Sequence, residues 1–176
     1  MEILIVGVLL VAFMVFVSTK IKKSAASAFE RETIEKEDFR LVKPEGFINP
    51  INENSRFAFE AYTKEFGKND AGELRQAQAN LVVVSDSSFE AVIENIRKTG
   101  GKVFSIKLLE NTPEEQKICL IESEKIEKDV IVKVFHKIIE SNQNQKIYEL
   151  KVSVLDAYLE EYKTGINDML ESFVVT

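Results

Sequence analysis

The order of strands and helices is clearest in residues 81–110, which read LVVVSDSSFEAVIENIRKTGGKVFSIKLLE. The first four residues are continuously apolar, as in a strand that is buried on both faces. Residues 86–88 offer helix N-cap side chains. The apolar residues that follow are spaced three and four apart, as in an amphipathic helix: Phe89, Val92, Ile93 and Ile96. Gly100 and Gly101 end this helix, and residues 102–109 alternate in polarity. The stretch therefore predicts strand, helix, strand.

The chain beyond this stretch predicts four further elements. Residues 117–121 and 147–154 have strand patterns, apolar residues in 125–140 fit a helical period, and a last helix covers about 155–172. The order from residue 81 is then β-α-β-β-α-β followed by α. We therefore predict an α+β fold of the ferredoxin-like type for residues 81–176, with an extra C-terminal helix. In this topology 81–84 and 118–121 are central strands, whereas 102–109 and 147–154 are edge strands.

Residues 39–80 form an aromatic-rich extension of this domain. Residues 39–42 predict a strand, 43–46 a turn containing Pro and Gly, and 70–80 a short helix. The alternation around residues 57–61 permits a second strand or a helix. The aromatic side chains either cover the core or form a docking surface for a partner, because aromatic residues contribute strongly to interfaces.

The last helix leaves the same two alternatives open. Its apolar residues repeat at intervals of four and three, which suits packing on its own domain and also a coiled-coil seam. The candidate partner surface combines residues from the extension and from this helix: Phe47, Phe57, Phe59, Tyr62, Phe66, Leu159, Tyr162, Ile166, Met169 and Phe173.

The N-terminus predicts a membrane anchor. Residues 3–17 are apolar apart from Gly7, and with the next few residues they approach the length of a membrane-spanning helix. A cleaved signal peptide and a buried core helix are the alternatives. We assign residues 1–22 to a single transmembrane helix and 23–38 to a charged stalk or juxtamembrane helix. Lysines follow the apolar run and none precedes it, so the positive-inside rule places the C-terminal domain in the cytoplasm.

The composition argues against several classes of function. The net charge of −6 disfavours nucleic-acid binding, which depends on clustered Lys and Arg. The phosphate-binding motifs G-x-G-x-x-G and G-x-x-x-x-G-K-[ST] do not occur in the sequence. His136 is the only histidine and is expected on the flank of a helix, without an orienting carboxylate. Cys119, the only cysteine, is expected to be an inert core residue. We therefore predict no catalytic, metal-binding or cofactor-binding residue.

These observations predict a membrane-anchored, non-enzymatic interaction or scaffold module, such as a subunit of a larger membrane complex. Its partners would be a membrane and a protein or a second copy of the chain, and not a nucleic acid. The alternative is a regulatory domain that binds a small ligand as a dimer, because such domains bind at a dimer edge without a fixed motif.

Overall fold

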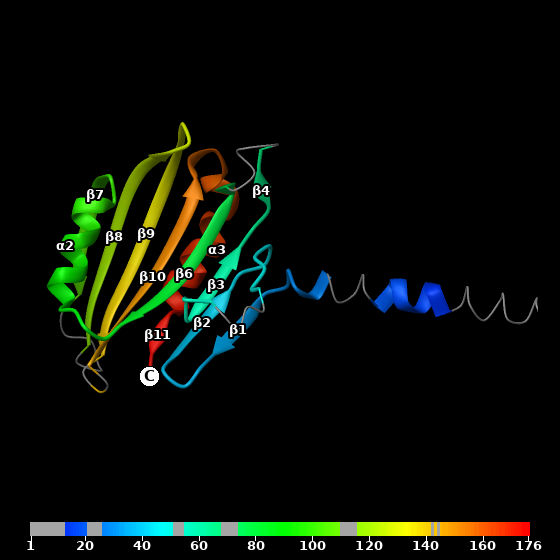
Figure 1. The fold of residues 1–176 in the computed structure, drawn as a ribbon, viewed down its shortest axis with the longest axis horizontal. Helices are drawn as coiled ribbons and strands as arrows, with labels where there is room; N and C mark the ends of the chain where they lie inside the picture. Colours follow the sequence, from blue (N-terminus) through cyan, green and yellow to red (C-terminus); the bar gives the residue numbers. More distant parts are fainter. Residues whose placement is uncertain are drawn as a thin grey trace, which may run out of the picture.

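The computed structural model describes residues 13–20, 26–50, 55–67, 74–109, 116–141, 143 and 145–176. These residues form a mixed α+β fold around a six-stranded antiparallel sheet with strand order β3-β6-β10-β9-β8-β7 (Figure 1). The strands of this sheet are β3 (Phe59–Tyr62), β6 (Ala77–Val84), β7 (Lys102–Leu109), β8 (Lys117–Glu127), β9 (Val130–Ser141) and β10 (Lys146–Leu155).

The two faces of the sheet are covered differently. Helix α2 (Phe89–Thr99) packs on one face. The other face carries helix α3 (Leu159–Ser172) and a three-stranded sheet with order β1-β2-β11. The remaining elements are β1 (Glu32–Glu35), β2 (Phe39–Lys43), β4 (Glu65–Phe66), β5 (Leu74–Arg75), the 3-10 helix η2 (Asp156–Tyr158) and β11 (Val174–Val175). Residues 13–20 are also helical.

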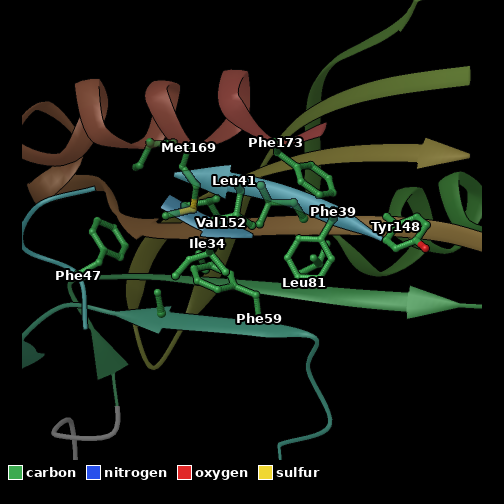
Figure 2. Close-up of a cluster of buried hydrophobic side chains, with 14 of the residues drawn as sticks. Ile34, Phe39, Leu41, Phe47, Phe59, Leu81, Tyr148, Val152, Met169 and Phe173 are labelled. Carbon is green, nitrogen blue, oxygen red and sulfur yellow. The ribbon is translucent and has the colours of Figure 1, made fainter. Parts of the chain in front are cut away.

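The main core lies between the large sheet and the layer formed by α3 and the small sheet. Tyr148, Leu150, Val152 and Val154 alternate along β10 and all point into it. Phe39 and Leu41 of β2 meet them from the small sheet, and Met169 and Phe173 meet them from the C-terminal end of the chain (Figure 2). A second cluster joins α2 to the opposite face of the large sheet through Phe89, Val92, Ile96, Cys119, Ile121, Ile138 and Ile147.

Several predicted elements are confirmed. Helix α2 begins after Ser88, whose side chain accepts a hydrogen bond from the backbone N–H of Ala91, and it ends at Gly100. The predicted strands at 102–109, 117–121 and 147–154 correspond to β7, β8 and β10. The predicted strand at 39–42 is β2, and the turn after it contains Gly46 at φ +85°. The last helix packs on its own domain, and Cys119 is buried.

The ferredoxin-like topology is wrong, because the predicted helix at 125–140 is a β-hairpin. Strands β8 and β9 are joined by Lys128 and Asp129, both at positive φ. Strand β9 is apolar on both faces along much of its length, so its pattern also matched a helical period. Its many β-branched residues favour a strand. The turn lacks the Asn-Gly or Asp-Gly pair that usually marks such a hairpin.

This extra strand changes the position of β10. The prediction placed 147–154 at an edge of the sheet, but β10 lies between β6 and β9. Its second face carries Glu149, Lys151 and Ser153, which suggested exposure to solvent, yet Ser153 is buried. The prediction that 102–109 is an edge strand is confirmed.

The N-terminal half also differs from prediction. Residues 23–38 were expected to form a charged stalk or a juxtamembrane helix, and within them Glu32–Glu35 form β1, paired with β2. Within 70–80 a helix was expected, but the described part, 74–80, belongs largely to β5 and β6. Among the residues that the structure describes, no helix has the length and apolar character needed to cross a membrane. Residues 1–12, which hold most of the apolar run, lie outside the described residues.

Candidate functional site

An open groove lies on the α3 face of the large sheet. Helix α3 covers β10 and β2, so the outer strands β7, β8 and β9 extend beyond its side. The groove between α3 and these strands has a volume of about 550 Å³. Its apolar lining residues are Leu109, Ile118, Leu120, Phe135 and Leu170, and its polar side chains include Lys107, Glu122, Lys137, Asn167 and Glu171. We call this feature the α3 groove.

Lys137 fixes the end of helix α3 against the sheet. Its Nζ donates hydrogen bonds of 2.8 Å to the carbonyl oxygens of Leu170 and Phe173. These carbonyls lie at the C-terminal end of α3, where the helix dipole favours a cation. Burial lowers the pKa of Lys137, and nearby Glu171 opposes that change. The lysine therefore holds one wall of the α3 groove in place.

The outer edge of β7 adjoins the α3 groove. Strand β7 is the last strand of the large sheet on this side. Phe104, Leu108 and Leu109 of this strand are exposed by 47%, 57% and 45%. The opposite edge strand, β3, is instead bridged by Ile48, which exchanges two backbone hydrogen bonds with Tyr62. Among the described residues no strand pairs with the outer edge of β7, so this edge combines an unpaired strand with exposed apolar side chains, which is typical of an interaction surface.

A buried polar cluster occupies the other face of the sheet. His136 of β9 is only 5% exposed, and its Nδ1 lies 2.9 Å from Oε1 of Glu149 on β10. The prediction of a helical flank position was wrong, since His136 lies in a strand. The orienting carboxylate was missed because Glu149 and His136 become neighbours only through the pairing of β10 with β9, in which Glu149 lies opposite Ile138. Nothing in the local sequence indicates that pairing.

This cluster lacks the geometry of a hydrolytic triad. Ser123 of β8 lies on the same face, but its Oγ and the Nε2 of His136 are both buried without a hydrogen-bond partner in the described structure. A serine nucleophile requires a hydrogen bond to the imidazole and access to substrate. Among the described residues, no group of three or more His, Cys, Asp or Glu side chains could hold a metal ion.

The predicted partner-surface residues divide into two groups. One group is buried in the main core: Phe47, Phe59, Ile166, Met169 and Phe173. The other group is half-buried: Phe57, Tyr62, Phe66, Leu159 and Tyr162. Leu159 and Tyr162 pack against the main core, whereas Phe66 packs against a separate cluster of Val132, Val134 and Leu155. Tyr162 shows how the two groups join, since its ring packs edge-on against Phe47 and its hydroxyl donates to Gln76. The structure places the exposed apolar residues of β7 elsewhere, at the far side of the large sheet.

Comparison with known proteins finds similarity of fold. No protein-family profile and no curated protein sequence matches the chain. The crystal structure of LpqN, involved in cell envelope biogenesis of Mycobacterium tuberculosis, matches with a TM-score of 0.56 at 13% identity, over 84% of this chain and 91% of LpqN. The solution structure of cyanobacterial PsbP (CyanoP) from Synechocystis sp. PCC 6803 matches with a TM-score of 0.54 at 11% identity, over 84% and 92%. The chain is therefore similar in fold to LpqN and CyanoP.

Proposed function

We propose that this chain is a non-enzymatic interaction module that binds a protein partner through the β7 edge and the α3 groove. The observation that carries the proposal is the set of exposed apolar side chains on the edge strand β7, beside the α3 groove. Outside the helical residues 13–20, three of the six large apolar side chains that are exposed in the described structure belong to β7: Phe104, Leu108 and Leu109. Ile126 and Ile131 lie at the tip of the β8–β9 hairpin, at the opposite end of the paired strands from Leu109.

The chemistry of this surface favours an extended partner segment. The outer edge of β7 offers eight residues of strand to which another strand can add. Apolar side chains of such a segment would enter the α3 groove beside Leu109 and Phe135. Lys102 and Lys107 are exposed along the same strand, so acidic side chains in the partner would be complementary.

The N-terminal apolar residues would place this module at a membrane. Phe13, Met14, Val15 and Phe16 are exposed by 60% or more in the structure, and they continue the apolar run that begins at Ile3. Such a surface is stabilised by lipid. The three lysines that follow the run favour a cytoplasmic position for the domain.

The test is purification of full-length tagged protein from gently solubilised membranes, compared with two variants. Leu109→Glu places a charge at the mouth of the α3 groove, and we expect loss of any stoichiometric partner. Ile126→Glu is the matched control. It changes an equally apolar side chain, 75% exposed, at the tip of the β8–β9 hairpin. Retention of the partner by Leu109→Glu, or loss with both variants, would contradict the assignment of this surface.

The volume of the α3 groove supports a second candidate function, binding of a small ligand by a regulatory domain. At about 550 Å³ the groove lies within the range of ligand pockets. A ligand would raise the melting temperature of the wild-type protein and not that of Leu109→Glu. A partner segment would instead bind the domain without any stabilising metabolite, so thermal shift and partner capture separate the two functions.

A further inference from the structure

The side chain of Lys43 clamps the N-terminal segment onto the domain. Lys43 is only 1% exposed, at the end of β2. Its Nζ donates hydrogen bonds to three carbonyl oxygens, those of Ala28 at 2.8 Å, Glu30 at 2.7 Å and Phe47 at 3.1 Å. The carboxylate of Glu32 lies 3.8 Å away. A buried ammonium with this many partners is held strongly, since breaking one such contact leaves a buried polar group unsatisfied.

Further contacts hold the same segment. The backbone N–H of Gly46 donates to the carbonyl of Phe29 at 2.8 Å. Gly46 has φ +85°, a left-handed backbone conformation that suits glycine in the turn after β2. Arg31 pairs with Asp168 of α3 at 3.2 Å, and β1 then pairs with β2. The chain is therefore bound to the domain from residue 28 onward.

The remaining tether is short compared with the domain. Seven residues, 21–27, separate the helical residues 13–20 from Ala28. Fully extended, they span at most roughly 25 Å. A globular domain of this size has a diameter of roughly 35–40 Å. A domain held by such a tether cannot turn its far side toward the attachment point of the anchor.

Figure 1 shows which side of the domain lies far from the N-terminal segment. Residues 26–31 join the domain beside β1 and β2, whereas β7 and α2 lie at the opposite end of the large sheet. We infer that the Lys43 clamp sets the orientation of the domain on a lipid surface. The end formed by residues 28–31 and 44–46 faces the lipid headgroups, and the β7 edge faces away from them. This inference rests on the membrane anchor of the proposed function.

The test measures the proximity of two labelled positions to lipid in the full-length protein. Glu45→Cys reports on the clamped end, and Lys98→Cys on α2 reports on the opposite end; both side chains are exposed. Cys119 is 0% exposed and stays unlabelled in the folded protein. In phosphatidylcholine vesicles that carry a headgroup-attached quencher, we expect quenching several-fold stronger at position 45 than at position 98.

Two variants test the role of the clamp. Lys43→Met removes the donor, and the difference in quenching between the two positions should shrink while the protein stays on the vesicles. Because this variant can also lose its fold, a second variant leaves the clamp intact. An insertion of about twenty Gly and Ser residues between Ala25 and Ala26 lengthens the tether by roughly 25 Å on average. It should abolish the difference as well.

The outcomes separate this inference from the anchor. Equal quenching at both positions in vesicle-bound wild-type protein overturns the fixed orientation and leaves the anchor in place. An unchanged difference after the insertion also overturns it, since the tether would then not set the orientation. Failure of the wild-type protein to float with vesicles overturns the membrane anchor itself.

Discussion

Two buried hydroxyl groups, that of Thr63 just after β3 and that of Ser123 in β8, have opposite hydrogen-bonding states. Thr63 is 2% exposed, and its Oγ1 both accepts from the N–H of Ala77 at 2.8 Å and donates to the carbonyl of Ala77 at 3.1 Å. Ser123 is 0% exposed, and its Oγ has no partner in the described structure. A buried hydroxyl without a partner lowers stability, whereas a satisfied one raises it.

The substitution Ser123→Ala is therefore expected to raise the free energy of unfolding by about 1 kcal/mol, because it removes an unsatisfied polar atom at little change in volume. The matched substitution Thr63→Val should lower it by about 1–2 kcal/mol, because it leaves the buried N–H of Ala77 without its hydroxyl acceptor. Urea denaturation followed by circular dichroism measures both. A loss of stability in Ser123→Ala would show that its hydroxyl is bonded in solution.

Lys151, on the polar face of β10, supplies a prediction of pH dependence. Burial lowers the pKa of Lys151, and the positive charge of Lys125 lowers it further. A lysine with a lower pKa in the folded state binds fewer protons folded than unfolded. Stability therefore rises with pH through the window that ends near the unfolded value of 10.5.

We expect this alkaline rise to be smaller in Lys151→Met, which has no group to titrate at that position. Thermal denaturation of both proteins between neutral and alkaline pH, each compared with its own neutral value, provides the measurement. If the two curves run parallel, Lys151 has the same pKa in both states.

At the scale of elements, the turn between β8 and β9 decides the topology. Lys128 and Asp129 have φ values of 48° and 65°, a conformation that L-residues adopt at a cost and that glycine adopts freely. The hairpin forms because its strands pair along their whole length, from Lys117 opposite Glu140 to Glu127 opposite Val130. Strand pairing therefore outweighs an unfavourable turn.

Replacement of Asp129 by glycine should relieve the backbone strain of its positive φ. Asp129→Gly is expected to stabilise the protein by about 1 kcal/mol. Arg97→Gly is the control, because glycine inside helix α2 should cost about 1 kcal/mol instead. Opposite shifts in the midpoint of urea denaturation would agree with both assignments. Destabilisation by Asp129→Gly would mean that the turn has a different conformation.

At the scale of the whole molecule, strand β2 and the C-terminal residues of the chain meet over one face of the large sheet. Phe39 of β2 packs edge-on against Phe173 at a centroid distance of 6.5 Å, and Val175 pairs with Phe39 in the small sheet. Met169 of α3 is 0% exposed in the same core. The domain therefore needs both its N-terminal extension and its last helix to bury the sheet.

Met169→Ala should lower the free energy of unfolding by about 2–5 kcal/mol, because it leaves a cavity between α3 and the sheet. The exposed Glu160→Ala on the same helix should change it by less than about 0.5 kcal/mol. The rate at which the buried Cys119 reacts with a thiol reagent measures the loss of structure in each variant. Burial raises the pKa of this thiol and suppresses its reaction in the folded state. Equal labelling rates in the two variants would place Met169 outside the cooperative core.

The sequence by itself determined those elements whose signals are local. Helix α2 has an N-cap serine and a single apolar face, and β7 and β10 alternate in polarity, so each was predicted near its true bounds. The core position of Cys119 and the apolar repeat of the last helix could likewise be predicted from neighbouring residues in the sequence.

Only the tertiary structure decided the rest, because it depends on pairing between distant residues. A stretch that is apolar on both faces, such as β9, fits a helix or a strand until its neighbours are known. The register between β9 and β10 brings Glu149 to His136, and the offset of α3 from β7 opens the α3 groove. Lys43 appeared in the sequence as part of a turn, and its role as a clamp comes from carbonyl groups up to fifteen residues away. Such long-range contacts form only when hydrophobic burial has brought the elements together.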